Sequence, residues 1–168
     1  MPESEGRPAE SEPTTFNLLF VCTGNTCRSP LACAIARRAI ERRGWKHVSV
    51  ESAGVAAGEG IPASDAAVRV AAERGLDLGT HSSRVLTPEW VDWADLVLVM
   101  SPSQEEVVLE LGGTGKVSLL GDFIDGEGSG EAIEDPFGGG EERYRRTFDR
   151  LESAVAGLLS RLATILAP

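Results

Sequence analysis

The sequence lacks the features that mark several classes of protein. Its 168 residues contain no uninterrupted apolar run near the roughly 20 residues that a membrane-spanning helix needs, so we expect no membrane span. Lys and Arg number only 16 against 26 Asp and Glu, which gives a net charge of −10. A nucleic-acid partner is not expected, because binding phosphates along a strand requires a surplus of basic residues. An anionic ligand therefore requires a local site that overrides the overall charge.

Cysteine is also scarce, with only Cys22, Cys27 and Cys33 in the chain. Three thiols are too few for the disulfide framework of a small secreted domain, so we expect the cytoplasm as the compartment. We expect no metal and no other cofactor, since no C-x-x-C pair occurs and neither His47 nor His81 has a partner at finger-like spacing. Clustered thiols in a reducing compartment are more often reactive than structural.

Residues 1–15 contain no Ile, Leu, Val or Phe and mix Glu with Ser and Pro, which predicts a disordered tail. They also lack the basic start and the apolar stretch of a signal peptide. Residues 16–168 suffice for one hydrophobic core, so we expect a single domain there. The sequence leaves the oligomeric state open.

Short β-rich runs alternate with helical stretches, which predicts a doubly wound α/β fold: a four-stranded parallel sheet with helices on both faces. Ser29 and Pro30 are typical of an N-cap followed by the first helical residue. The loop at 121–140 is long, acidic and rich in glycine, as functional or disordered loops often are. The expected strands span 17–21, 48–52, 95–100 and 116–120, and the expected helices span 30–43, 62–74 and 141–166, with a short helix starting at Pro88 and a longer one at Pro102.

The strongest chemical signal is the spacing Cys22-x5-Arg28, which follows the first predicted strand and leads into a helix. The N–H groups of such a loop and the positive end of the helix bind a tetrahedral dianion, and a guanidinium matches two phosphate oxygens. The same field stabilises a thiolate, the nucleophilic form of cysteine. We therefore expect Cys22 to attack a phosphoryl group that Arg28 and the loop hold. Gly24 permits close backbone approach, Asn25 tolerates a left-handed conformation, and Ser29 is placed to steady the leaving thiolate.

This chemistry also needs a proton donor. The leaving group must be protonated, and water must later be deprotonated to hydrolyse the cysteinyl phosphate. Within the acidic loop only Asp135 precedes a proline, which stiffens the backbone beside it, so we assign both proton transfers to Asp135. An ordinary Asp-Pro turn is the alternative. We expect the remaining acidic residues of 122–142 to be solvated and to favour cationic segments beside the phosphorylated residue.

Residues 21–30, VCTGNTCRSP, resemble the phosphate-binding signature of the low-molecular-weight protein tyrosine phosphatases, and Asp135-Pro136-Phe137 resembles the motif of their general acid. The resemblance extends through 52–54, His81 with Arg84, 94–100 and the closing helix, so it covers nearly everything from Phe16 onward. It implies a cysteine-dependent protein phosphatase that acts on phosphorylated proteins without metal, and in which His81 supports the loop. The residues it places at the substrate are Thr23, Gly24, Asn25, Thr26, Cys27, Ser29 and Phe137, beside the catalytic Cys22, Arg28 and Asp135.

Within this family, Thr26 and the residues after Asp135 bear on the substrate. Tyrosine-directed members usually carry an aliphatic residue at the position of Thr26, whereas threonine there resembles the bacterial protein arginine phosphatases. Phe137 is followed by glycine instead of a second aromatic residue, which resembles the same subgroup. Ala56 departs from it, because the subgroup tends to place an aromatic residue there. We expect hydrolysis of phosphoarginine in proteins, with phosphotyrosine as the alternative and Thr26 as a mere loop-former still open.

The cysteines leave two further questions. The family resemblance implies that Cys27 forms a reversible disulfide with Cys22 and silences it, and the alternative is that Cys27 is a small buried residue of the loop. Arsenate reductases share this fold and loop, but they need resolving cysteines after the second helix, and residues 61–100 contain none. Cys33 is left, on a helix that leads away from the loop, so this redox function is the least favoured.

Overall fold

The computed structural model describes residues 16–126 and 132–166. The expected disordered tail at 1–15 and part of the acidic loop lie outside the described residues. None of the helices in the two described ranges has the length and apolar character needed to cross a membrane. The elements are β1 (Phe16–Cys22), α1 (Arg28–Arg43), β2 (Val48–Gly54), α2 (Asp65–Glu73), α3 (Pro88–Trp93), β3 (Leu96–Val99), α4 (Pro102–Glu110), β4 (Val117–Leu119), the 3-10 helix η1 (Leu120–Gly126) and α5 (Glu141–Leu166).

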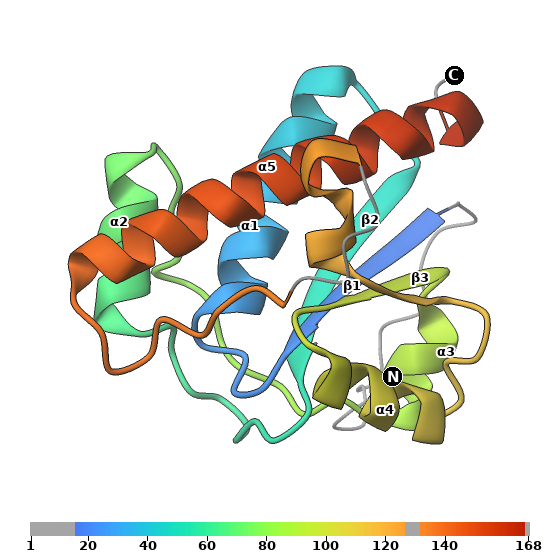
Figure 1. Ribbon diagram of the computed structural model, residues 1–168, viewed down its shortest axis with the longest axis horizontal. Helices are drawn as coiled ribbons and strands as arrows, with labels where there is room; N and C mark the ends of the chain where they lie inside the picture. Colours follow the sequence, from blue (N-terminus) through green and yellow to red (C-terminus); the bar gives the residue numbers. More distant parts are fainter. Residues whose placement is uncertain (1–15, 127–131, 167–168) are drawn as a thin grey trace.

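The four strands form one parallel sheet in the order β2-β1-β3-β4, as predicted (Figure 1). The register pairs Cys22 of β1 with Gly54 of β2 and Val21 of β1 with Val99 of β3. The chain first places β2 on one side of β1 and then crosses to place β3 on the other. The crevice beyond the carboxyl ends of β1 and β3 is therefore the topological switch point, where open α/β sheets bind their ligands.

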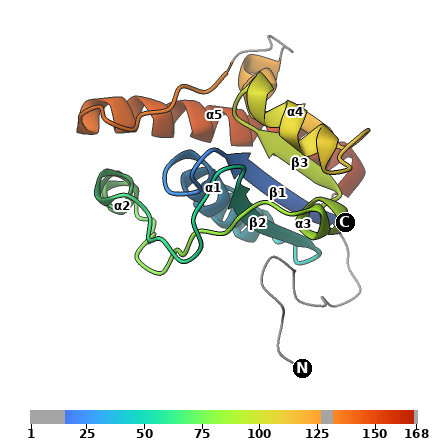
Figure 2. The same cartoon turned by 90° about the horizontal axis from the view of Figure 1, so that it is seen from below.

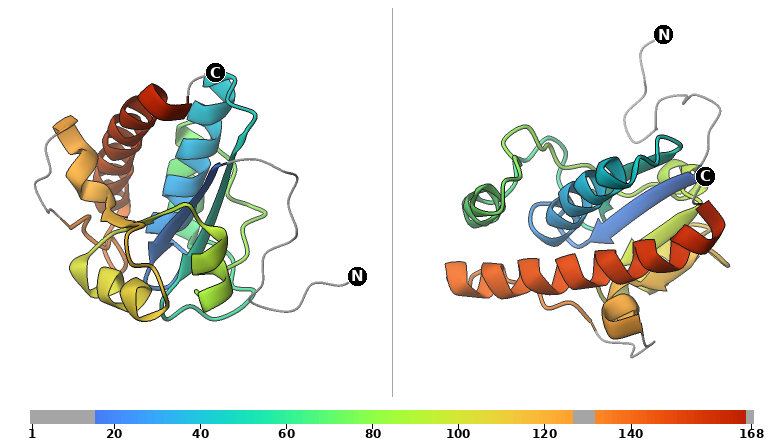
Figure 3. Two further views of the ribbon diagram at one scale, coloured as in Figure 1. Left: turned by 90° about the vertical axis from the view of Figure 1, so that its right-hand side faces the viewer. Right: turned by 90° about the horizontal axis from the view of Figure 1, so that it is seen from above.

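Helices cover both faces of the sheet because the side chains of β1 alternate in direction. Leu18 and Phe20 belong to the core under α1 and α5, whereas Leu19 and Val21 belong to the core under α3 and α4. The two layers are visible in Figure 2 and Figure 3, where α5 runs lengthwise past α1 and the strands. Burial on both faces explains the nearly continuous apolar sequence of this strand.

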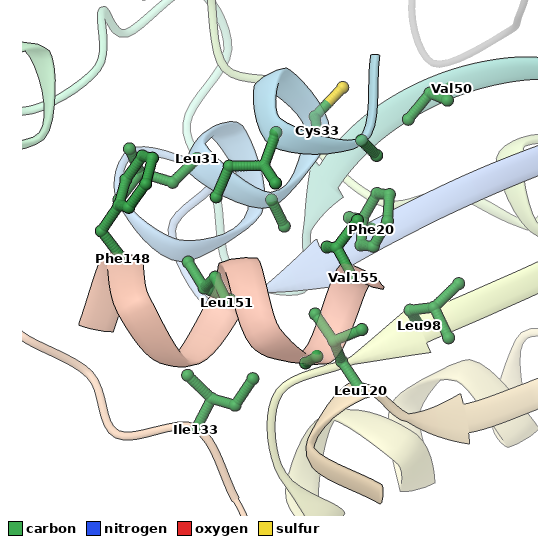
Figure 4. Close-up of a cluster of buried hydrophobic side chains, with 14 of the residues drawn as sticks. Phe20, Leu31, Cys33, Val50, Leu98, Leu120, Ile133, Phe148, Leu151 and Val155 are labelled. Carbon is green, nitrogen blue, oxygen red and sulfur yellow. The ribbon is translucent and has the colours of Figure 1, made fainter. Parts of the chain in front are cut away.

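The closing helix α5 has the bounds that its apolar spacing predicted. Phe148, Leu151 and Val155 turn toward Leu31 of α1 and Phe20 of β1, and all five side chains are buried (Figure 4). A helix of this length is stabilised by such an apolar stripe. The segment that follows β4 was expected to be loop throughout, but it begins with η1, which packs against α5.

Two helix starts differ from the prediction. Helix α1 begins at Arg28 with Cys27 as its N-cap residue, so Ser29 lies inside the first turn and does not cap the helix. Helix α2 begins at Asp65, after an N-cap at Ser64, and not at Pro62. In contrast, α1 ends at Arg43 as predicted, and Gly44 follows it in a left-handed conformation, with φ of 71°.

Candidate active site

The loop between β1 and α1 forms the floor of a cavity of about 230 Å³. Cys22 is the last residue of β1 and Arg28 is the first of α1, so the whole C-x5-R segment lies at the switch point of the sheet. The structure brings together eight of the residues that the sequence placed at the site. They are Cys22, Thr23, Gly24, Thr26, Cys27, Arg28, Asp135 and Phe137.

Behind the cavity, Ser29 holds the sulfur of Cys22. Its Oγ lies 2.9 Å from Cys22 Sγ and accepts a hydrogen bond of 2.8 Å from Asn25 Nδ2. Because Oγ already accepts from Asn25, its own proton is available to Sγ, and the Ala53 carbonyl at 3.4 Å is the longer alternative. Ser29 thus donates to a thiolate at this position, which stabilises the ionised sulfur.

Asn25 sets the shape of the loop from a buried position. Its φ is 55°, in the left-handed region, as the sequence predicted. Its side-chain amide donates to Ser52 Oγ at 3.0 Å and accepts from the backbone N–H of Arg84 at 2.9 Å. Its carbonyl lies 2.6 Å from His81 Nε2. Ser52 and Arg84 were not predicted as site residues, and the short motifs around them, S-A-G and H-x-x-R, were the available signal.

His81 lies beside the loop and contacts its backbone at Asn25. Burial lowers the pKa of the imidazole, the hydrogen bond to the Asn25 carbonyl partly opposes this effect, and the charge of Arg84 lowers the pKa further. The neutral ring donates a hydrogen bond from Nε2–H to the carbonyl oxygen of Asn25, which can only accept. The loop therefore has a fixed donor at this point.

Gly54, at the end of β2, packs directly against the loop. A Cβ atom there would lie 2.6 Å from the Thr23 carbonyl oxygen and 2.9 Å from the backbone N of Asn25. Just beyond it, the N–H groups of Val55 and Ala56 donate to the carbonyls of Cys22 and Thr23 at 3.0 and 2.9 Å. Glycine is required because no side chain fits between β2 and the loop backbone.

Arg28 is buried at the edge of the cavity and fixed at one end. Its Nη1 donates to the Ile133 carbonyl at 2.9 Å, and its Nη2 lies 3.8 Å from Asp135 Oδ2. The Asp135 side chain is 51% exposed, and its Oδ1 accepts from the Phe137 N–H at 3.0 Å. The guanidinium and the carboxyl group therefore meet across the cavity, with the carboxyl group open to solvent.

The far wall of the cavity contains Thr26 and Cys27. The Thr26 carbonyl accepts from the N–H of Ser64 at 3.0 Å. Cys27 Sγ lies 3.3 Å from Ser64 Oγ and 3.5 Å from the Tyr144 hydroxyl. Burial raises the pKa of that hydroxyl, and the contact with Cys27 raises it further. No local pattern pointed to Ser64 or Tyr144, because both are far from Cys27 in the sequence, by 37 and 117 positions.

Cys33 stands apart from this site. It lines a different cavity, of about 580 Å³, which also contains His81 and Arg84. Burial raises the pKa of the Cys33 thiol to about 12, which leaves it protonated and unreactive. Within residues 16–126 and 132–166, no three His, Cys, Asp or Glu side chains are grouped to hold a metal ion.

Several carboxylates of the acidic segment are paired with arginines. Arg143 lies 3.4 Å from Glu134, and Arg145 lies 3.3 Å from both Glu141 and Glu142. The side chains of Glu134 and Glu142 are 70% and 71% exposed, so they are solvated as expected, and arginines of α5 also offset their charge. The surplus of negative charge beside Asp135 is correspondingly smaller than the residue count for 122–142 indicated.

Comparisons with known proteins point to the same chemistry. Residues 17–166 match the family described as low molecular weight phosphotyrosine protein phosphatase. A protein-arginine-phosphatase from Geobacillus stearothermophilus is 40% identical over 151 residues, which are 89% of this chain and 97% of that protein. A probable low molecular weight protein-tyrosine-phosphatase from Ralstonia solanacearum is 38% identical over 141 residues, 83% of this chain and 86% of that protein. A solved mutant of YwlE arginine phosphatase, in which serine replaces a cysteine and the active site serine is phosphorylated, superimposes with a TM-score of 0.82 at 36% identity, covering 89% of this chain and 97% of that one.

Proposed function

Because the chain belongs to the low molecular weight phosphotyrosine protein phosphatase family, we propose that it hydrolyses phosphoarginine in proteins through a phosphoryl group carried on Cys22. One observation carries the proposal: a single cavity is lined by Cys22, Arg28, Asp135 and Thr26. A nucleophile, an anion holder and a proton donor around one cavity satisfy the geometric needs of phosphoryl transfer.

The first half of the reaction transfers the phosphoryl group to the enzyme. The Cys22 thiolate forms a bond to phosphorus as the bond from phosphorus to the guanidine nitrogen breaks. Asp135 gives its proton to that nitrogen, so arginine leaves as a neutral group before it takes up a further proton from water. Arg28 and the loop N–H groups hold the phosphoryl oxygens, where negative charge is greatest.

The second half releases inorganic phosphate. The Asp135 carboxylate accepts a proton from water as the water oxygen bonds to phosphorus, and the bond between sulfur and phosphorus breaks. Ser29 Oγ, 2.9 Å from Cys22 Sγ, donates a hydrogen bond to the departing thiolate and stabilises it. In the mutant of YwlE arginine phosphatase, the phosphorylated active site serine supports a covalent intermediate of this kind, since the mutation replaces a cysteine with serine.

Two features of the cavity and one relative favour phosphoarginine. Thr26 presents a hydroxyl where an aliphatic side chain would suit an apolar ring, and that hydroxyl can orient the attacking water. The Asp135 carboxyl group, already 3.8 Å from one guanidinium, is suited to pair with a second. The relative from Geobacillus stearothermophilus, named for arginine phosphatase activity, supports this choice.

Phosphotyrosine is the second candidate, because Phe137 is 73% exposed at the mouth of the cavity. An exposed ring there can stack on the ring of a phosphotyrosine, although it can equally stack on a planar guanidinium. The relative from Ralstonia solanacearum, named as a probable tyrosine phosphatase, supports this alternative.

The two candidates are separated by kinetics on matched peptides that carry phosphoarginine or phosphotyrosine. We expect the wild type to have the higher kcat/KM on phosphoarginine. Thr26→Ile should shift the ratio of the two kcat/KM values toward phosphotyrosine by about tenfold. Adding or removing one or two carbon atoms in a binding pocket changes the discrimination between substrates by this order. Thr26→Ser, which keeps the hydroxyl, should retain the wild-type preference.

A wild type that prefers phosphotyrosine contradicts the substrate proposal, as does a Thr26→Ile variant with unchanged selectivity. Full activity of Cys22→Ser would exclude the mechanism itself. We place the active protein in the cytoplasm, because Cys22 must stay reduced to act as a nucleophile. We assign catalysis to one domain at residues 16–168.

A further inference from the structure

Gln104 is a buried polar residue that the mechanism above does not use. It lies on α4 with 2% of its surface exposed, and both ends of its amide are bonded. Gln104 Oε1 accepts from the N–H of Met100 at 2.7 Å, and Gln104 Nε2 donates to Thr23 Oγ1 at 3.1 Å. Two bonds of normal length fix the position and the orientation of the amide.

Met100, at the end of β3, joins this amide to the other side of the cavity. Its carbonyl accepts from the N–H of Ile133 at 2.8 Å, and the Ile133 carbonyl accepts from Arg28 Nη1 at 2.9 Å. Two residues after Ile133 comes Asp135. A continuous row of hydrogen bonds therefore runs from Thr23, through Gln104 and Met100, to the segment that carries the proposed proton donor.

We propose that Gln104 is a positioning residue for the phosphatase reaction, because it ties Thr23 on one wall of the cavity to the Asp135 segment on the other. The inference rests on the proposed function and adds a residue outside the loop and the Asp-Pro motif. Gln104 does not touch the phosphoryl group. It acts through Thr23, which lines the cavity, and through Met100, which holds Ile133.

The two connections affect the reaction in different ways. Thr23 belongs to the loop that holds the phosphoryl group, so a disturbance there weakens catalysis equally for every leaving group. The Asp135 segment delivers the proton to the leaving group, so a disturbance there matters most when the leaving group is strongly basic. The dependence of the rate on the leaving group therefore separates the two connections.

The test compares p-nitrophenyl phosphate, which has a weakly basic leaving group, with phenyl phosphate, which has a strongly basic one. We expect Gln104→Met to lower kcat/KM on p-nitrophenyl phosphate by about tenfold, the usual order for residues that act through a neighbour, and to lower it clearly more on phenyl phosphate. Thr23→Val, which removes only the hydroxyl, should cause a smaller loss that is equal on both substrates.

Two further variants serve as controls. Gln104→Glu keeps an oxygen for the Met100 N–H and should restore the wild-type ratio between the substrates. Ser103→Ala, the neighbouring exposed position on α4, should leave kcat/KM unchanged on both. Thermal unfolding establishes that each variant is folded, and Gln104→Asn, too short to reach both partners, replaces Gln104→Met if the latter does not fold.

A folded Gln104→Met or Gln104→Asn variant with wild-type kcat/KM overturns the proposal. An equal loss on both substrates also overturns it, because a merely structural role or a role through Thr23 alone predicts no dependence on the leaving group. If the wild type releases phosphate from neither these esters nor a phosphoarginine peptide, the proposed function itself fails, and that result is distinct from either outcome for Gln104.

Discussion

Asn25 and Ser29, the polar side chains directly behind the nucleophile, are each bonded more than once, and this redundancy keeps the loop in one conformation. Asn25 shows the principle: the left-handed backbone, with φ of 55°, is stabilised by Ser52, Arg84 and His81. Buried polar groups that are fully bonded rigidify a site, whereas partly bonded ones destabilise it. The loop is therefore preorganised for the phosphoryl group before substrate binds.

The three cysteines differ in their surroundings, and this difference predicts how the protein responds to peroxide. Peroxide oxidises the Cys22 thiolate to a sulfenic acid, and we propose that the Cys27 thiol then displaces water to form a disulfide. Both residues line the same cavity, whereas Cys33 lies in another and is protonated, with a pKa of about 12. Peroxide should inactivate the wild type, and dithiothreitol should restore nearly all of its activity.

The matched variants are Cys27→Ala and Cys33→Ala, followed by activity assays and by mass spectrometry of the oxidised protein. Cys27→Ala should be inactivated without recovery, because the sulfenic acid then proceeds to irreversible forms. Cys33→Ala should behave as the wild type does. Full recovery of the Cys27→Ala variant would show that Cys27 is only a buried residue of the loop.

At the scale of elements, the end of β2 is as important for the loop as the loop's own sequence. The parallel register places Gly54 opposite Cys22, and the two following N–H groups bond the carbonyls of Cys22 and Thr23. The strand thus continues its pairing into the loop and supports it from one side. This support depends on glycine, because a Cβ atom would contact the backbone at Thr23 and Asn25.

Gly54→Ala should therefore displace the loop and reduce kcat/KM by about 100-fold, the order expected when a reacting group moves by about 1 Å. Gly58→Ala is the matched control, since a Cβ atom there meets Ile61 at 3.4 Å, an ordinary contact. Steady-state kinetics with p-nitrophenyl phosphate and thermal unfolding of both variants provide the measurement. A folded Gly54→Ala variant with normal kcat/KM would contradict this role for β2.

The elements were predictable where local chemistry decides them. Helix α1 ends at Arg43 and α3 begins at Pro88, as predicted, because Gly44 supplies a left-handed C-cap and Thr87 accepts from the N–H of Trp90. The predictions were wrong where a distant partner intervenes. Ser29 is taken into the bonds with Cys22 and Asn25 and so does not cap α1, and the residues before α2 are extended up to the cap at Ser64.

At the scale of the molecule, the sequence predicted the α/β fold, and its motifs indicated which residues surround the cavity. Apart from His81, the predicted residues share one loop or one Asp-Pro motif. Gln104 and Tyr144, which reach the site from α4 and α5, carried no local signal: Gln104 is 81 positions from Thr23, and Tyr144 is 117 positions from Cys27. Such contacts depend on the crossing of the chain at the switch point, which no short pattern specifies.

The distribution of charge also became clear only in the folded molecule. Glu134, Glu141 and Glu142 are paired with arginines of α5, so they add little to the field around the cavity. Exposed pairs of this kind contribute little stability. The phosphoryl group is instead accommodated locally, by Arg28, the loop N–H groups and the start of α1, within a chain of net charge −10.

The most direct measurement is the mass of the protein after a reaction with a phosphoarginine peptide is stopped rapidly with denaturant. We predict that the fragment containing Cys22 gains the mass of one phosphoryl group, that Cys22→Ala shows no such gain, and that free phosphate appears as the modified form decays. Release of phosphate from the peptide by the Cys22→Ala variant, or a phosphoryl group on another residue of the wild type, would contradict the account.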